Sequence, residues 1–237
     1  MIEVHVTYFL NFETALQAAV KRNIKKLPDN GKGLQICYYH GEDHQQPIEN
    51  LICVPLDQIY DYFLNTRNRF PTFLSHEGTD LPPDKKEEVD TYVASALQSV
   101  RRDREKQKQH YMRLIEQQDP DVKQGPKRAF LMTSRHTSVM QYSTNGIAGA
   151  LKKLGYQVRI LIETDDMQFL YPEWQVREIY EFNPHLTINI NHMFNDIVNE
   201  KTWNVVWWQD PMEELVSSEP LKVRSRDLVF SYDLSFD

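Results

Sequence analysis

The segment most informative about the fold is Phe130-Leu131-Met132-Thr133-Ser134-Arg135-His136-Thr137-Ser138, because it joins a short apolar run to a cluster of hydrogen-bonding residues. The same pattern recurs along the second half of the chain, and helical spacing fills most of the intervals between the runs. The later runs and their polar ends are 158–162 with Glu163 to Asp166, 186–190 with Asn191 and His192, 205–208 with Gln209 to Pro211, and 228–232 with Asp233. Apolar strands alternating with helices are typical of a parallel sheet with crossover helices. The sequence therefore predicts an α/β fold with a Rossmann-like parallel sheet.

Function is expected at the polar ends of these strands, because ligands of open parallel sheets bind in the crevice outside the carboxyl ends of the strands. The candidate ligand-binding residues are Ser134, Arg135, Thr137, Ser138, Glu163, Asp165, Asn191, His192, Gln209 and Asp233. The first turn places hydroxyls, a guanidinium and an imidazole ahead of a helix N-terminus, which suits an anion or a polyhydroxylated ligand. Alternatively, its Ser and Thr residues cap the helix while Arg135 and His136 are solvated. Glu163 is placed to hold ribose or sugar hydroxyls, whereas Asp165 or Asp166 can instead cap the next helix.

The glycines do not form a nucleotide-binding motif. A dinucleotide fingerprint needs a glycine-rich turn directly after the strand, and the turn at Ser134 to Ser138 contains no glycine. A Walker-type phosphate loop is absent from the sequence too. Gly146 and Gly149 lie inside the predicted helix 142–154, where we expect them to allow a close approach of the helix to the sheet. Gly155 is expected to end that helix in a left-handed conformation. No cluster of residues has the spacing of metal ligands, so no metal and no cofactor is expected.

The first 126 residues predict a small α/β unit over 1–79 and a long helix within 80–119, followed by a linker and the Rossmann-like domain at 127–237. Strands are expected at 2–8, 34–39 and 51–54, helices at 12–24 and 56–64, and a loop at 70–80. The helix 83–117 has an apolar stripe that fails between Arg101 and His110, so we expect a solvated helix bridging two packed ends. The alternatives are a homodimer formed through this helix, and a nucleic-acid contact by its basic residues Arg101, Arg102, Arg104, Lys106 and Lys108, which interleaved acidic residues disfavour.

Composition sets limits on the class of protein. Apolar residues make up 41% of the 237 residues and charged residues 26%, so the chain can bury a core. The net charge of -7 argues against a general nucleic-acid binder. Cys37 and Cys53 lie inside apolar runs and are expected to be buried free thiols. The N-terminus lacks the pattern of a secretory signal, and no apolar run approaches the ~20 residues of a membrane span, so we expect a cytoplasmic protein.

Four sequence elements of the second half, taken together, resemble a known family. They are Phe130-Leu131-Met132-Thr133-Ser134, Ala150-Leu151-Lys152-Lys153-Leu154-Gly155-Tyr156 with Val158 resuming the sheet, Phe182-Asn183-Pro184-His185-Leu186, and Trp207-Trp208-Gln209-Asp210-Pro211. With these elements, residues 127–237 resemble the N-terminal half of a two-domain GT-B glycosyltransferase, and most closely the bacterial spore-maturation CgeB-like branch. The helix-Leu-Gly-strand element is common to many Rossmann-like proteins, whereas the Asn-Pro-His-Leu turn followed by Trp-Gln-Asp-Pro is more specific. Residues 1–126 resemble no family that we identify.

The resemblance implies transfer of a sugar from a nucleotide-sugar donor to an acceptor whose identity is unknown. In such folds the N-terminal domain usually presents the acceptor, and the C-terminal domain holds the donor nucleotide. The position of the catalytic base carries over to His136 and Asp210, whose imidazole or carboxylate can deprotonate an acceptor hydroxyl; Asp210 can equally be a turn residue. No second Rossmann-like domain follows Asp237, so we expect a truncated enzyme that is inactive alone. The alternatives are a non-catalytic interaction or ligand-binding module and a flavodoxin-like small-ligand sensor.

Overall fold

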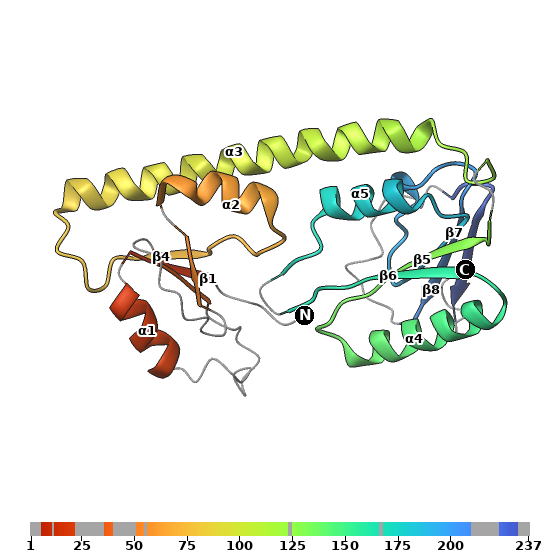
Figure 1. Ribbon diagram of the computed structural model, residues 1–237, viewed down its shortest axis with the longest axis horizontal. Helices are drawn as coiled ribbons and strands as arrows, with labels where there is room; N and C mark the ends of the chain where they lie inside the picture. The colour runs from red at the N-terminus through yellow and green to blue at the C-terminus, as the bar shows by residue number, and fades with distance from the viewer. Residues whose placement is uncertain are drawn as a thin grey trace. The chain divides into compact units, whose positions relative to one another are not determined.

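The computed structural model describes residues 6–10, 12–21, 36–39, 51–54, 56–122, 125–165, 168–209 and 223–231. The chain forms two compact units, shown in Figure 1. Unit 1 comprises Met1–Lys106 with Thr164–Phe169, and unit 2 comprises Gln107–Glu163 with Leu170–Asp237. None of the helices in the described ranges is both long and apolar enough to cross a membrane.

Unit 1 contains a four-stranded parallel sheet with the strand order β3-β2-β1-β4. Its elements are β1 (Val6–Phe9), α1 (Phe12–Lys21), β2 (Ile36–Tyr39), β3 (Leu51–Cys53), the 3-10 helix η1 (Leu56–Gln58), α2 (Ile59–Asn65), β4 (Phe73–Ser75) and the first part of α3 (Pro83–Glu116). The apolar stripe of α3 is confirmed, because Val93, Leu97 and Val100 are buried in the core with Tyr8 and Phe63. The side chains of Cys37 and Cys53 lie outside the described residues, so the expectation of free thiols stays a prediction.

Two expectations for unit 1 are wrong. The segment 70–80 is not only a loop, because β4 pairs with β1 inside it. Arg104, expected to be solvated or to contact nucleic acid, is buried with 3% of its surface exposed. Its guanidinium donates to the carbonyl oxygens of Phe63 and Thr66, and it lies 4.8 Å from the centre of the Phe70 ring. These contacts stabilise a buried charge that sequence alone assigned to the surface.

Unit 2 contains a five-stranded sheet in which every neighbouring pair is parallel. Its elements after α3 are β5 (Arg128–Met132), α4 (Ser138–Lys153), β6 (Gln157–Leu161), α5 (Pro172–Phe182), β7 (Leu186–Ile190), the 3-10 helix η2 (Asn195–Ile197), β8 (Trp203–Trp208) and β9 (Asp227–Ser231). The predicted α/β fold with a parallel sheet is therefore confirmed. The strand order β6-β5-β7-β8-β9 is that of flavodoxin-like doubly wound sheets, numbered 2-1-3-4-5 from the first strand.

Helices cover both faces of this sheet, and Figure 1 shows α4 and α5 on opposite sides of it. Ala129 and Leu131 of β5 pack in one core with Ala148 and Leu151 of α4. Phe130 and Met132 pack in the other core with Ile179 and Phe182 of α5. Successive strand residues point to opposite faces, which explains why β5 is apolar at every position except Arg128.

Several local expectations for unit 2 are corrected. Helix α4 begins at Ser138 instead of 142. A Cβ atom added at Gly146 or Gly149 would meet no atom within 4 Å, so neither glycine serves a close approach to the sheet. Asp165 does not cap α5, whose N-cap is Tyr171.

Two further observations concern unit 2. Trp208 is buried, whereas its neighbour Trp207, which points to the opposite face of β8, is 36% exposed. Gly155, with φ of 85°, ends α4 in the left-handed conformation as predicted.

Candidate functional site

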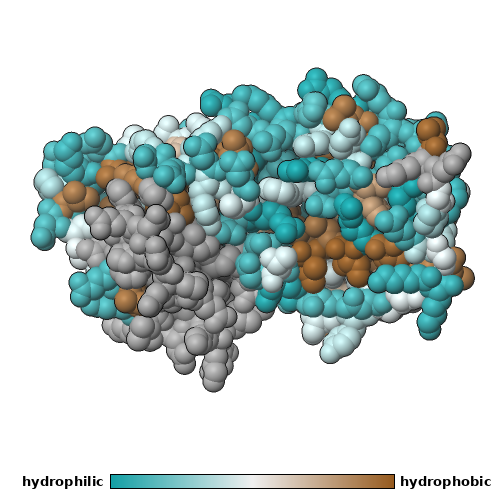
Figure 2. Space-filling view, in the orientation of Figure 1, coloured by the Kyte–Doolittle hydropathy of each residue, from teal (hydrophilic) through white to brown (hydrophobic). Residues whose placement is uncertain are grey.

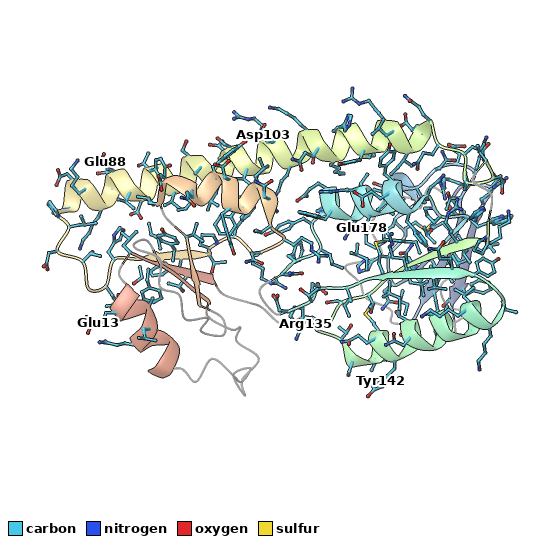
Figure 3. The ribbon with its side chains drawn as sticks, in the orientation of Figure 1. Glu13, Glu88, Asp103, Arg135, Tyr142 and Glu178 are labelled. Atoms are coloured by element: carbon cyan, nitrogen blue, oxygen red, sulfur yellow. The ribbon has the colours of Figure 1, made fainter. Side chains whose placement is uncertain are left out.

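The candidate site is the carboxyl edge of the unit 2 sheet, where β5 and β7 are neighbours but lead to opposite faces. β5 continues into α4 on one face, whereas β7 continues into η2, whose Ile197 packs in the core of the other face with α5. A doubly wound sheet opens a crevice at such a switch point. The residues that enter it are those directly after β5, β6, β7 and β8, and Figure 3 labels Arg135 in the turn between β5 and α4.

Glu163 fixes the turn after β5. Its carboxylate is buried, with 6% of the residue exposed. One carboxylate oxygen accepts a hydrogen bond from Ser134 Oγ at 3.4 Å, and the other accepts one from the Arg135 backbone N–H at 3.0 Å. The end of β6 therefore holds the turn that follows β5, and charge-assisted bonds of this kind are about twice as strong as neutral ones.

The turn also makes hydrogen bonds within itself. Ser134 Oγ accepts from the His136 N–H at 3.3 Å, and the Thr137 hydroxyl donates to the Ser134 carbonyl at 3.4 Å. Gln141 Nε2 of α4 donates to the Arg135 carbonyl at 2.7 Å. Thr137 is the N-cap residue of α4, yet its side chain makes no capping bond. The first backbone N–H groups of α4 therefore receive no side-chain cap from Thr137, and such groups at a helix N-terminus have no partner within the helix.

Asn191 and Gln209 connect the other strands of the site. Asn191 has a left-handed backbone with φ of 59°, and its backbone N–H donates to the Trp207 carbonyl at 3.0 Å. Its side-chain oxygen accepts from the Gln209 N–H at 2.7 Å. Gln209 Nε2 in turn donates to Ser143 Oγ of α4 at 3.2 Å. The ends of β7 and β8 are thus tied to α4, the helix that follows β5.

A buried row of amides and a hydroxyl supports this edge. Thr187 and Asn189 lie on one face of β7, and Asn204 of β8 pairs in register with Thr187. Asn204 Oδ1 accepts from Thr187 Oγ1 at 2.8 Å and from Asn189 Nδ2 at 2.9 Å. Paired polar groups inside a sheet fix its register, because leaving any one of them unpaired costs about 1–3 kcal/mol.

Two buried polar atoms at the carboxyl edge have no hydrogen-bond partner among the residues that the structure describes. They are the hydroxyl of Thr133, directly after β5, and the indole N–H of Trp208, the last residue of β8. Thr133 is 6% exposed and Trp208 is 8% exposed. Most buried polar groups in folded proteins are paired, so each exception calls for a reason, and one such reason is a ligand that supplies the partner.

The remaining candidates are placed as follows. His136 is half-buried in the turn, and Ser138 is the exposed first residue of α4. His192 is exposed and packs beside Phe194, with the ring centroids 5.1 Å apart, and desolvation by the surrounding protein lowers its pKa. Asp165 belongs to the segment Thr164–Phe169, which is part of unit 1. The predicted residues Asp210 and Asp233 lie outside the described residues.

The Asn183-Pro184-His185-Leu186 turn lies at the opposite, amino edge of the sheet. Asn183 ends α5 with φ of 48°. His185 Nδ1 accepts a hydrogen bond from the Arg128 N–H at 3.0 Å. Burial, with the positive charges of Arg128 and Lys127, lowers the pKa of His185. This turn connects α5 to β7 and contributes to the fold, whereas the residues of the crevice come from other segments.

Sequence reasoning did not single out Thr133, Ser143 or Trp208 as site residues. A partial signal was present in the alternation Thr187-Ile188-Asn189-Ile190-Asn191, because polar residues at every second position are unexpected in a strand covered on both faces. Among the described residues no group of three His, Cys, Asp or Glu side chains is arranged to hold a metal ion. Comparison of the chain with protein families, with curated proteins and with solved structures gives no match.

Proposed function

We propose that the carboxyl edge of unit 2 binds a polyhydroxylated ligand, and that the chain is the acceptor-side part of a glycosyltransferase that uses a nucleotide-sugar donor. The observation that carries the proposal is the pair of unpartnered buried groups, Thr133 Oγ1 and Trp208 Nε1. A hydroxyl that can donate or accept and an N–H that can only donate match the mixed hydrogen-bonding capacity of sugar hydroxyls.

The chemistry of the crevice favours a neutral ligand over a nucleotide phosphate. Its side chains are mostly hydroxyls and amides, from Ser134, Thr137, Ser143, Asn191 and Gln209. The buried Glu163 carboxylate and the Arg135 guanidinium bring opposite charges to the turn, so it has no excess of positive charge for a polyanion. We propose that the donor nucleotide is held outside the described residues.

In this proposal His136 is the general base. Its backbone N–H is fixed by Ser134, and its side chain extends from the turn that precedes α4. An imidazole that approaches an acceptor hydroxyl within hydrogen-bonding distance can remove its proton as the hydroxyl oxygen attacks the anomeric carbon of the donor, whose nucleotide then leaves. The sequence resemblance to GT-B acceptor domains agrees with this role for the first strand–helix turn.

Titration of the protein with unlabelled sugars tests the proposal. We would record backbone amide NMR spectra of the ¹⁵N-labelled chain with glucose, galactose, N-acetylglucosamine and mannose, each added to saturation. We expect shifts confined to the turn after β5, to Asn191 and to Gln209, where the ligand would lie. Shifts elsewhere only, or no shifts with any of the four sugars, would refute sugar binding at this edge.

Turnover separates the enzyme from a non-catalytic binding module. A chain extended to include a donor domain would be assayed for release of the nucleotide from UDP- and GDP-sugars in the presence of the sugar that binds. We expect His136→Ala to reduce the rate by a factor of about 10² to 10⁴, the usual contribution of a general base, and to leave sugar binding measurable. Sugar binding without any release of nucleotide would favour the binding module.

A further inference from the structure

One face of the unit 2 sheet carries exposed apolar side chains on β8 and β9. On this face α4 packs against β5 and β6, and Val205 of β8 lies at the margin of the same core. Trp203 and Trp207 share this face of β8 with Val205, because alternate residues of a strand point to the same side. Leu228 and Phe230 extend the face onto β9, since they pair in register with Val205 and Trp207.

The four side chains Trp203, Trp207, Leu228 and Phe230, which we call the open face, are large, apolar and partly in water. Their exposed fractions are 44%, 36%, 44% and 55%. Since an aromatic residue buries about 150–250 Å² when it is covered, the open face leaves on the order of 350 Å² of apolar surface in water. Parallel sheets are normally covered on both faces, and an apolar patch of this size marks a contact surface.

The side of α4 that points away from the sheet is uncharged. No Asp, Glu, Lys or Arg occurs in the sequence from Ser138 to Leu151. Val139 is 67% exposed and Tyr142 is 79% exposed, and Figure 3 shows Tyr142 directed away from the sheet. In Figure 2, pale residues of intermediate hydropathy are visible at the lower edge of unit 2, where α4 lies. A surface helix usually carries charged residues opposite its buried face, so this outer side is typical of a helix with a second neighbour.

Two copies of the chain can cover both surfaces at once. The open face lies beside α4, since Gln209, the residue after β8, donates to Ser143 Oγ of α4 at 3.2 Å. With a two-fold axis parallel to the strands, each α4 lies beside the other copy's α4 and over the other copy's open face. This axis keeps the carboxyl edges of both sheets at one end, so Tyr142, near the start of α4, comes to the ends of β8 and β9. Each copy uses the same surface, so the assembly closes at two copies.

We propose that the chain forms a homodimer in which Tyr142 of each copy contacts Trp207 and Phe230 of the other. The outer side of α4 is an uncharged surface on the same molecule, whereas a helix with charges facing the sheet would have to bury them. Val139 and Tyr142 add about 250 Å² to the open face, so each copy offers on the order of 600 Å². The total of about 1,200 Å² lies at the lower limit for stable interfaces, so we expect a dissociation constant of micromolar order.

Sedimentation equilibrium of the full chain, from about 1 μM to about 0.5 mM, measures this association. We expect a monomer–dimer equilibrium with its midpoint in the micromolar range. Tyr142→Lys and Phe230→Glu should each remain monomeric, because a dimer of either variant would bury two unpaired charges. Phe73→Glu is the matched control and should dimerise as the wild type does, because Phe73 is 64% exposed on β4 of unit 1. Thermal unfolding of each variant checks that it folds.

A mixture of the Tyr142→Lys and Phe230→Glu proteins tests the pairing itself. In a mixed dimer one contact keeps both wild-type residues and the other pairs the lysine with the glutamate. The mixture should therefore dimerise where neither variant does alone, and a mixture that stays monomeric would refute the contact between α4 and β9.

Three other outcomes would overturn the proposal. The first is a wild-type chain that remains monomeric up to about 0.5 mM, where a micromolar constant gives mostly dimer. The second is a dimer that persists in folded Tyr142→Lys, whose position on the outer side of a helix tolerates the change. The third is a dimer that is lost in Tyr92→Glu and kept in both unit 2 variants, which would assign the contact to α3, where Tyr92 is 43% exposed.

Discussion

Arg224 and Asp227 form an ion pair at the start of β9 that bears on the stability of unit 2. Both nitrogens Nε and Nη2 of Arg224 donate to Asp227 Oδ1, at 3.0 and 2.8 Å. Asn195 Nδ2 and the Arg224 backbone N–H donate to Asp227 Oδ2, at 2.8 and 2.7 Å. The Asp227 side chain has no exposed surface, so removing its charge leaves Arg224 without its partner in a site that is mostly closed to water.

We predict that Asp227→Asn lowers the free energy of unfolding by about 3 kcal/mol at pH 7. Burial alone would raise the pKa of Asp227, but the hydrogen bonds from Arg224 and Asn195 outweigh it, so the pKa is lowered. A carboxyl with a lowered pKa stabilises the fold above its unfolded pKa of about 3.9, and the contribution is lost as the pH falls through the folded pKa. Urea unfolding at several pH values should therefore show the difference between the two proteins shrinking below about pH 4.

Asp121→Asn is the control for this prediction. Asp121 pairs with Lys127, and both side chains are 59% exposed. Exposed pairs contribute about 0–1 kcal/mol, so this variant should unfold close to the wild type at pH 7. A loss in Asp121→Asn as large as that in Asp227→Asn would contradict the assignment of the stability to the buried pair.

The glycines of α4 show how a helix can be improved where its backbone is unconstrained. Gly146 and Gly149 are interior to the helix and have open space where a Cβ atom would lie, whereas Gly155 has φ of 85° after the last turn. We predict that Gly146→Ala and Gly149→Ala each raise the free energy of unfolding by about 0.5–1 kcal/mol, because alanine favours the helix. Gly155→Ala should lower it, because the left-handed conformation is costly for alanine.

Thermal or urea unfolding of the three glycine variants checks this prediction. The sign of the change is the test, since the same substitution is made in each. A loss of stability in Gly146→Ala or Gly149→Ala would mean that these positions do meet a neighbour when the helix carries a side chain. A gain in Gly155→Ala would contradict its role as the end of α4.

Hydrophobic periodicity predicted most elements because their patterns are local. The strands of unit 2 are apolar runs, as expected for strands covered on both faces, and the stripe of α3 has helical spacing. Strand β4 could not be predicted, since Phe73-Leu74-Ser75 is too short to show a pattern and forms by pairing with β1. The principle that ligands bind at the carboxyl ends of parallel strands predicted Ser134, Glu163, Asn191 and Gln209 as candidate site residues. It could not find the unpartnered groups of Thr133 and Trp208, because pairing depends on contacts between distant segments.

The whole molecule contains two α/β units, each with its own core. The crevice at the carboxyl edge belongs to unit 2. The proposed ligand site of unit 2 depends on a buried hydroxyl, that of Thr133, which has no partner within the described part of the chain.

The substitution Thr133→Val tests this ligand site, because valine has nearly the shape of threonine and lacks the hydroxyl. The sugar that shifts the NMR spectrum would be titrated into wild type, Thr133→Val and the control Thr202→Val, whose buried hydroxyl is paired with the Pro184 carbonyl at 3.0 Å. If Thr133 is kept for a ligand, Thr133→Val should raise the free energy of unfolding by about 1 kcal/mol and bind sugar about tenfold more weakly, while Thr202→Val loses stability and keeps its affinity. Unchanged sugar affinity in Thr133→Val would contradict the account.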